Sequence, residues 1–154
     1  MSRRFHYTLQ PVLLERQWEL DAACQELARI NQLIASGEQA LQNLQQEQAS
    51  VSSAWQQESA QAQGLQRDRF ELVTRYMAQL AGQYQQQQSS LQQYRNERDG
   101  LIERVGQARR ALDAVEEHRD LSKVKFTRQQ LSADGKIADD QWSMAQTRGE
   151  TEHE

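Results

Sequence analysis

Residues 13–55 carry apolar side chains at alternating spacings of three and four positions. This spacing is typical of a coiled coil, in which one narrow apolar seam on a helix faces a partner helix. Thr8 and Pro11 favour a helix start just before the seam, because threonine caps helices and proline fits the first turn. We therefore predict a helix over about residues 9–60, with Gly37 as a weak point that costs about 1 kcal/mol relative to alanine. The positions of this first seam are Leu13, Arg16, Leu20, Ala23, Leu27, Ile30, Ile34, Gly37, Leu41, Leu44, Gln48, Val51 and Trp55.

A second seam with the same period begins at residue 73. Residues 56–64 contain no large apolar side chain and end in a glycine, which favours a turn at about residues 61–65. We predict a second helix over about residues 66–130. The Ser-Ala-Asp-Gly sequence at 132–135 resembles a helix stop, so residues 131–154 are expected to form a partly disordered tail. The second seam comprises Val73, Met77, Leu80, Tyr84, Gln87, Leu91, Tyr94, Arg98, Leu101, Val105, Ala108, Leu112 and Val115.

Each predicted helix has only one narrow apolar stripe, so the two stripes are best buried against each other. The predicted fold is all-α: two long helices form an antiparallel coiled-coil hairpin over residues 9–130, after an N-terminal segment at 1–8. A turn near residue 62 would place Leu13 opposite Leu112. Helix 2 would then extend beyond helix 1, and the residues after about 118 would be a free extension. This extension contains Arg119, Lys123, Lys125, Phe126 and Arg128.

The two predicted helices also differ in their balance of acidic and basic side chains. Residues 9–60 carry seven acidic and two basic side chains, whereas residues 65–130 carry twelve basic and nine acidic ones. Opposite bias favours pairing within one chain over pairing between copies, and therefore a monomer.

The net charge of −4 offers no basic face for a nucleic acid. With Cys24 as the single cysteine and no run of about 20 apolar residues, we expect a cytoplasmic protein that is not inserted in a membrane.

The sequence shows no pattern that supports catalysis or a cofactor. His6, His118 and His153 lie far apart, and no histidine or cysteine cluster has the spacing of metal ligands. Asp139 and Asp140 are adjacent carboxylates, but they fall in a predicted exposed tail. We also find no glycine-rich phosphate-binding loop. We therefore expect no enzyme, no catalytic residue, no metal and no cofactor.

Trp18 falls on the outer face of the first predicted helix, near Pro11 and Leu14. An exposed tryptophan beside a leucine is common in protein-binding hot spots, so these three residues are a candidate partner patch. The alternative is that the C-terminal segment folds back and covers Trp18 with Ile137, Trp142 or Met144. Trp55, in contrast, is in seam phase and is expected to pack near the turn.

Four residues near the start of the second helix share a helical spacing: Phe70, Thr74, Met77 and Ala81. They form either a stripe that binds a groove on a partner or the packed end of the coiled coil.

Residues 5–16 (FHYTLQPVLLER) and 19–28 (ELDAACQELA) resemble the N-terminus of the FliJ/YscO family. Residues 75–80 (RYMAQL) are similar to the start of that family's second helix, and residues 139–142 (DDQW) are similar to its ending. The resemblance implies the central stalk of a flagellar or virulence-associated type III secretion system. It implies a hairpin similar to the gamma subunit of rotary ATP synthases, with its terminal end seated in the pore of a hexameric export ATPase.

The resemblance also implies a second partner, the large membrane protein of the export gate. The contact residues carried over by position are Phe70, Thr74, Met77 and Ala81, where Thr74 departs from the expected aliphatic residue. The basic extension and the Trp18 patch are the candidate contacts with the ATPase or another partner. Such a protein would be cytoplasmic and peripherally associated with the secretion apparatus at the inner membrane.

Two other functions remain open from the sequence. One is an escort or carrier for type III secretion chaperones. The other is a generic structural coiled coil that dimerises in parallel, without a link to secretion. Polar residues in seam positions, such as Arg16 and Arg98, fit a specifically registered pairing better than a permanent rod.

Overall fold

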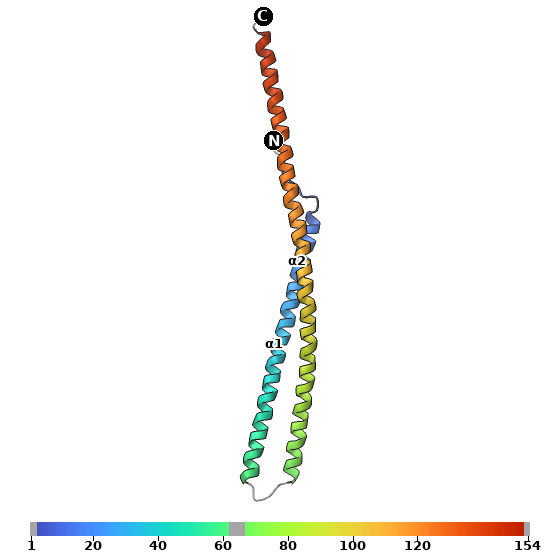
Figure 1. Cartoon of the computed structure of the whole chain (residues 1–154), viewed down its shortest axis with the longest axis vertical. Coiled ribbons are helices and arrows are strands. Elements are labelled where there is room, and N and C mark those ends of the chain that lie inside the picture. Colours follow the sequence, from blue (N-terminus) through green and yellow to red (C-terminus); the bar gives the residue numbers. More distant parts are fainter. Residues whose placement is uncertain (1–2, 62–66, 153–154) are drawn as a thin grey trace. The chain divides into compact units, whose positions relative to one another are not determined.

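A computed structural model describes residues 3–61 and 67–152. It contains two helices, α1 over Gln10–Gln61 and α2 over Arg67–Thr151, and the described residues include no strand (Figure 1). The start of α1 agrees with the predicted position to within one residue. The turn predicted at about residues 61–65 lies outside the described residues, apart from Gln61, with which α1 ends.

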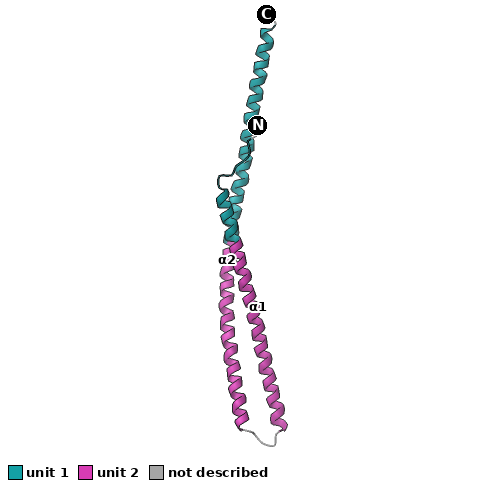
Figure 2. Ribbon diagram, turned by 180° about the vertical axis from the view of Figure 1, so that it is seen from behind, with its two compact units in different colours: residues 1–20, 107–154 teal, residues 21–106 magenta. Residues whose placement is uncertain are grey.

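The chain divides into two compact units, and each contains a segment of both helices (Figure 2). The first unit comprises residues 1–20 and 107–154, and the second comprises residues 21–106. In both units the α1 and α2 segments pack against each other, which confirms the predicted all-α pairing of two long helices.

Contacts between side chains define the helix direction in the second unit. As the residue number falls along α1, the number of its partner on α2 rises, so the two segments run antiparallel. These contacts are Glu58 with Arg69, Glu47 with Tyr76, Gln45 with Tyr84, and Glu38 with Arg95.

The buried centre of the second unit lies where the first seam is richest in large apolar residues. Ile30, Ile34 and Leu91 form the buried cluster, and Leu33, Leu41, Tyr94 and Leu101 pack around it. All the predicted seam positions of both helices are buried or half-buried. In the first unit, Leu13 and Leu112 are also buried, as the predicted register requires. The heptad spacing therefore identified the packed face correctly in both units.

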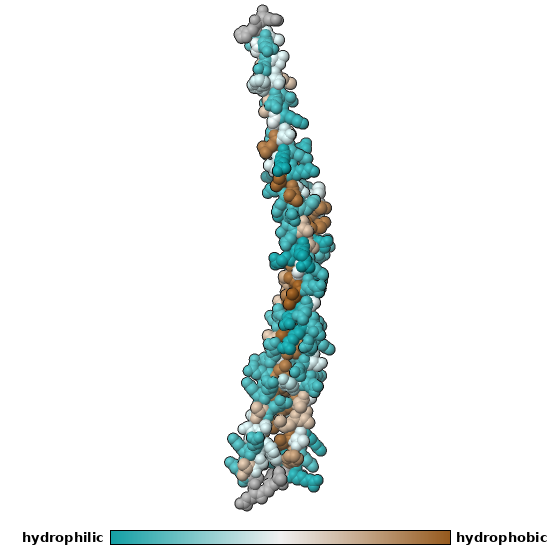
Figure 3. Space-filling model, in the orientation of Figure 1, coloured by the Kyte–Doolittle hydropathy of each residue, from teal (hydrophilic) through white to brown (hydrophobic). Residues whose placement is uncertain are grey.

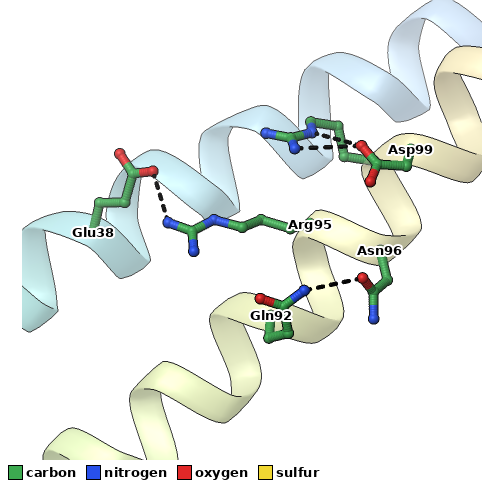
Figure 4. Close-up of polar contacts among 6 residues, drawn as sticks. Glu38, Gln92, Arg95, Asn96 and Asp99 are labelled. Carbon is green, nitrogen blue, oxygen red and sulfur yellow. Dashed lines mark hydrogen bonds and ion pairs between the residues drawn. The ribbon is translucent and has the colours of Figure 1, made fainter.

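The outer surface is polar, and the charge bias contributes directly to the pairing. On the face that Figure 3 shows, polar side chains dominate and apolar ones are confined to separate patches. Figure 4 shows Arg95 of α2 reaching Glu38 of α1, with 3.4 Å between Nη2 and Oε1. Arg69 of α2 pairs with Glu58 of α1 in the same sense. Each exposed pair contributes only about 0.2–1 kcal/mol, so these pairs favour a register more than they stabilise the fold.

The predicted helix stop at residues 132–135 is wrong. α2 continues through this sequence to Thr151, and the predicted end at about 130 and the tail at 131–154 are corrected accordingly. A glycine stop requires a residue with positive φ, and no described glycine adopts one. Gly135 alone costs the helix only about 1 kcal/mol, and no proline follows it to end the helix. All side chains from Leu131 to Glu152 are exposed.

Gly37 has a packing role that its helix propensity conceals. It is buried, and a Cβ atom built on it would lie 2.9 Å from Cδ1 of Leu91 and 3.2 Å from Nε2 of Gln87. Because Leu91 is itself only 1% exposed, it has little room to move. The glycine therefore lets α2 approach α1 closely at the buried cluster.

We predict that Gly37→Ala fails to stabilise the protein or lowers its free energy of unfolding. The gain of about 1 kcal/mol in helix propensity is offset by about 1–3 kcal/mol of overpacking against Leu91. Gly82→Ala and Gly100→Ala are matched controls, because nothing lies within 4 Å of their added Cβ atoms. Both controls should stabilise by about 1 kcal/mol in urea unfolding followed by circular dichroism. An equal gain from all three substitutions would contradict the close approach at Gly37.

Candidate protein-binding surfaces

The first candidate surface is the patch on the first turns of α1. Leu14 and Trp18 are four residues apart and Pro11 precedes Leu14 by three, so the three side chains share one face of the helix. Trp18 is 72% exposed and Leu14 is 43% exposed. A large aromatic ring held on a regular helix and left in water is available for a partner without rearrangement.

The alternative in which the C-terminal segment covers Trp18 is wrong. Ile137, Trp142 and Met144 all lie on α2, and each is more than half exposed. α2 continues as a helix where folding back would require a turn. The Trp18 patch is therefore not covered by any described residue.

The second candidate surface is the stripe at the start of α2. Phe70, Thr74 and Ala81 are exposed, whereas Met77 is half-buried at a seam position. The ring of Phe70 lies 5.8 Å from the ring of Trp55 on α1, at 49°, yet Phe70 remains 50% exposed. Met77 therefore packs at the end of the helix pair, and one side of Phe70 remains exposed. Binding of the stripe to a partner stays a prediction.

Two hydrogen bonds lie beside this stripe, one between α2 and α1 and one within α2. The Tyr76 hydroxyl donates a hydrogen bond to Oε1 of Glu47 at 2.9 Å. This hydrogen bond raises the pKa of Tyr76, because the phenol must keep its proton to donate it. Within α2, the Thr74 hydroxyl donates to the backbone oxygen of Phe70 at 2.8 Å, which directs the threonine side chain along its own helix.

The third surface was not expected from the sequence and involves the N-terminal segment. Tyr7 is 7% exposed, and its hydroxyl lies 2.7 Å from Nδ1 of His118 and 3.5 Å from the backbone oxygen of Val115. The Phe5 ring stacks on the Tyr7 ring at 6.5 Å and contacts the Phe126 ring at 5.6 Å. We call Phe5, Tyr7, His118 and Phe126 the aromatic clasp.

The aromatic clasp shows that the predicted free extension after about residue 118 is wrong. Residues 118–126 of α2 are partly covered by the segment that precedes α1, because Phe5 and Tyr7 supply apolar area that the hairpin lacks there. Phe126 is half-buried as a result, and Arg119 is half-buried and pairs with Asp120 at 3.3 Å. The remaining members of the predicted basic set are exposed: Lys123, Lys125 and Arg128.

The clasp borders a shallow recess of about 410 Å³. Arg119 and Lys123 lie on its α2 side, and the N-terminal segment forms the other side. The lining residues are Phe5, His6, Tyr7, Gln10, Arg119, Asp120 and Lys123. One sequence signal anticipates this surface: Phe5 and Tyr7 alternate with polar residues, as an extended segment with one buried face would.

Two further features concern chemistry and membranes. Among the described residues, no three histidine, cysteine, aspartate or glutamate side chains gather closely enough to hold a metal ion. Neither helix, over its described length, contains a stretch of 18 residues apolar enough to cross a bilayer.

Comparison with known protein families gives a match over most of the chain. A sequence model of a protein family described as flagellar FliJ protein matches residues 5–151. The match includes the clasp, both helices and every candidate surface residue. No curated protein and no solved structure matches the chain.

We predict that Tyr7→Ala destabilises the N-terminal segment, because truncation of a buried aromatic side chain typically costs about 3 kcal/mol or more. Tyr7→Phe is the matched control, which keeps the ring packing and loses only the hydroxyl contacts, at a cost of about 1 kcal/mol. Hydrogen exchange of residues 3–12 measures the effect. Exchange should accelerate strongly in Tyr7→Ala and weakly in Tyr7→Phe, while the backbone around Ile30 stays protected. Unchanged exchange in Tyr7→Ala would show that the clasp does not hold the segment.

Proposed function

Because the chain belongs to the FliJ family, we propose that it is the central stalk of a bacterial type III export apparatus, flagellar or virulence-associated. In this role it inserts into the hexameric export ATPase, promotes assembly and activity of the ring, and links the ring to the export gate. The family match over residues 5–151 carries the proposal. The protein itself performs no chemistry and works in the cytoplasm, at the inner membrane.

The paired helices have the properties that such a stalk needs. Residues of one chain bury the seams of α1 and α2 against each other, so stiffness does not depend on a second subunit. The polar, glutamine-rich outer faces offer weak and adaptable hydrogen bonds to a ring of six similar subunits. A stalk that favours each subunit in turn must bind none of them tightly.

The ATPase contacts in this proposal come from the first unit. Trp18, Leu14 and Pro11 present an apolar face on α1. The basic side chains Lys123, Lys125 and Arg128 are exposed on α2, and Arg119 and Phe126 lie beside the aromatic clasp. A tryptophan anchor with basic residues in the same unit would suit apolar pockets and acidic loops that line a ring pore.

The export-gate contact comes from the second unit. The exposed side of Phe70, followed by Thr74 and Ala81 at helical spacing, offers a shallow stripe with one aromatic anchor. Met77 supports the stripe from the seam side. The hydroxyl of Thr74 bonds to its own helix, which leaves its methyl group available for an apolar partner.

A chaperone escort is the alternative that the experiment must separate from the stalk. Both functions need exposed apolar side chains, but only a stalk changes the oligomeric state and hydrolysis rate of the ATPase. Binding to empty secretion chaperones without any effect on the ATPase would favour the escort.

We predict that the purified protein stimulates hexamer formation and ATP hydrolysis by the cognate export ATPase. Trp18→Asp should raise the concentration for half-maximal stimulation about 30-fold, the effect of losing a hot spot of about 2 kcal/mol. Gln42→Asp is the matched control, since it adds the same charge at an exposed position on a different face of α1. A wild-type protein without effect on the ring would refute the stalk. Equal stimulation by wild type and Trp18→Asp would show that Trp18 is not part of the interface with the ATPase.

Phe70→Asp should weaken binding to the cytoplasmic domain of the export-gate protein about 10-fold or more, because it puts a charge into an apolar contact. Stimulation of the ATPase should be unchanged, because Phe70 belongs to the other unit. Gln79→Asp adds the same charge at an exposed position of α2 outside the stripe, and should leave both activities intact. Calorimetric titration with the gate domain and the hydrolysis assay measure the two effects. Parallel loss of both activities in Phe70→Asp would identify the stripe as structural.

A further inference from the structure

The last part of α2 carries apolar side chains on two different faces. One face continues the paired seam and includes Phe126, Ile137 and Met144. The other is a separate row of large residues, which we call the outer stripe: Leu121, Val124, Leu131 and Trp142. In a helix of 3.6 residues per turn, the outer stripe lies well away from the seam that the aromatic clasp covers.

All four large residues of the outer stripe are at least half exposed, from 50% for Val124 to 67% for Leu131. Between and after them, at the same spacing of three and four, lie Arg128 and the small residues Gly135, Ala138 and Ala145. A row of this kind is the seam of a coiled coil, and no described residue covers it. The order is also uneven, with large residues early in the row and small ones late, except for Trp142.

We propose that the outer stripe binds the outer stripe of a second copy of this chain, in antiparallel orientation. If the two-fold axis passes beside residue 133, Val124 faces Trp142 of the second copy, Leu121 faces Ala145, and Leu131 faces Gly135. Leu121 and Leu131 then each meet a small residue, and Trp142 meets the medium-sized Val124, so no layer pairs two of the largest side chains. Arg128 meets Ala138, where its aliphatic stem can pack and its charge reaches water.

The charges beside the stripe fit the same register. Lys125 lies across from Asp139 of the second copy, and Asp120 lies across from Arg148. The two-fold axis repeats each pair, so four attractive pairs form. Asp134 meets its own copy at the axis and is the only repulsive pair. Charges at flanking positions of a coiled coil determine its orientation, and here they favour the antiparallel one.

A parallel dimer through the same stripe is disfavoured by the same residues. It would place Arg128 against Arg128 and Asp134 against Asp139 on both sides. Gly135 would face Gly135 and leave a void, while the two Trp142 rings would compete for one layer. The antiparallel register therefore follows from the order of large, small and charged residues along α2.

The proposal uses only this stretch of α2 and does not depend on the function proposed above. Three of the four distinct core layers contain glycine or alanine, so we expect a weak, reversible dimer with micromolar or weaker affinity rather than a permanent one. The protein would be a monomer when dilute. Where it accumulates, it would cover its own outer stripe.

Sedimentation equilibrium of the full chain tests the association between about 10 µM and about 500 µM. The apparent mass should rise from the monomer value of 17.9 kDa as concentration increases. Leu131→Glu, or Trp142→Glu as a second variant, should abolish the rise. Met144→Glu is the matched control, because Met144 is as exposed as Leu131 but lies on the other face, and it should dimerise like wild type. A constant monomer mass overturns the proposal, as does equal loss of association in the Met144→Glu control.

Two further measurements test the register. Asp134→Asn should tighten the dimer because it removes the one like-charge pair, whereas Asp140→Asn removes the same charge from the opposite face and should leave the affinity unchanged. For orientation, a spin label on Ser143→Cys in a Cys24→Ser background reports the distance between copies. The antiparallel register predicts about 30 Å along the axis, from about 20 residues at 1.5 Å each. Labels within about 20 Å of each other would show a parallel dimer and refute the antiparallel one.

Discussion

The two helices are held together by the burial of one apolar seam of α1 against one apolar seam of α2. Neither helix alone has enough apolar surface for a core, and long helices gain most of their stability from such packing rather than from propensity. The buried cluster of Ile30, Ile34 and Leu91 marks where the contact is closest, and Gly37 makes that approach sterically possible. Ion pairs such as Glu38 with Arg95 lie at the edge of this contact and favour one register of the two helices.

Most of the fold followed from the sequence because a heptad seam encodes its own partner face. Seam positions from Leu13 to Trp55 and from Val73 to Val115 are all buried or half-buried, and even Arg16, Gln48, Gln87 and Arg98 are half-buried. The predicted helix stop failed because its local signal was weak. Gly135 did not end α2, since a glycine without positive φ merely lowers helix propensity.

The candidate sites were predicted less completely than the fold. Exposure of Trp18 follows directly from its phase relative to Leu13 and Leu20, and the structure agrees. The aromatic clasp escaped prediction because it joins Tyr7 to His118 across 111 positions. The alternation of Phe5 and Tyr7 with polar residues indicates a buried face but does not identify its partner on α2. Phe126 consequently changed from a free residue of a basic extension into one that packs on Phe5. The candidate surfaces are therefore distinguished by differences of exposure along the two helices.

The fold requires the two seams to pair within one chain. Single-molecule energy transfer measures this pairing, with dyes on Gln39→Cys and Asn96→Cys in a Cys24→Ser background, at concentrations where chains do not meet. The labelled positions neighbour the contact of Glu38 with Arg95 and, like it, are 57 residues apart. Pairing of neighbouring helices predicts a dye separation below about 30 Å and high transfer. A separation near 85 Å, roughly the length of an unpaired helix over this span at about 1.5 Å per residue, would contradict it.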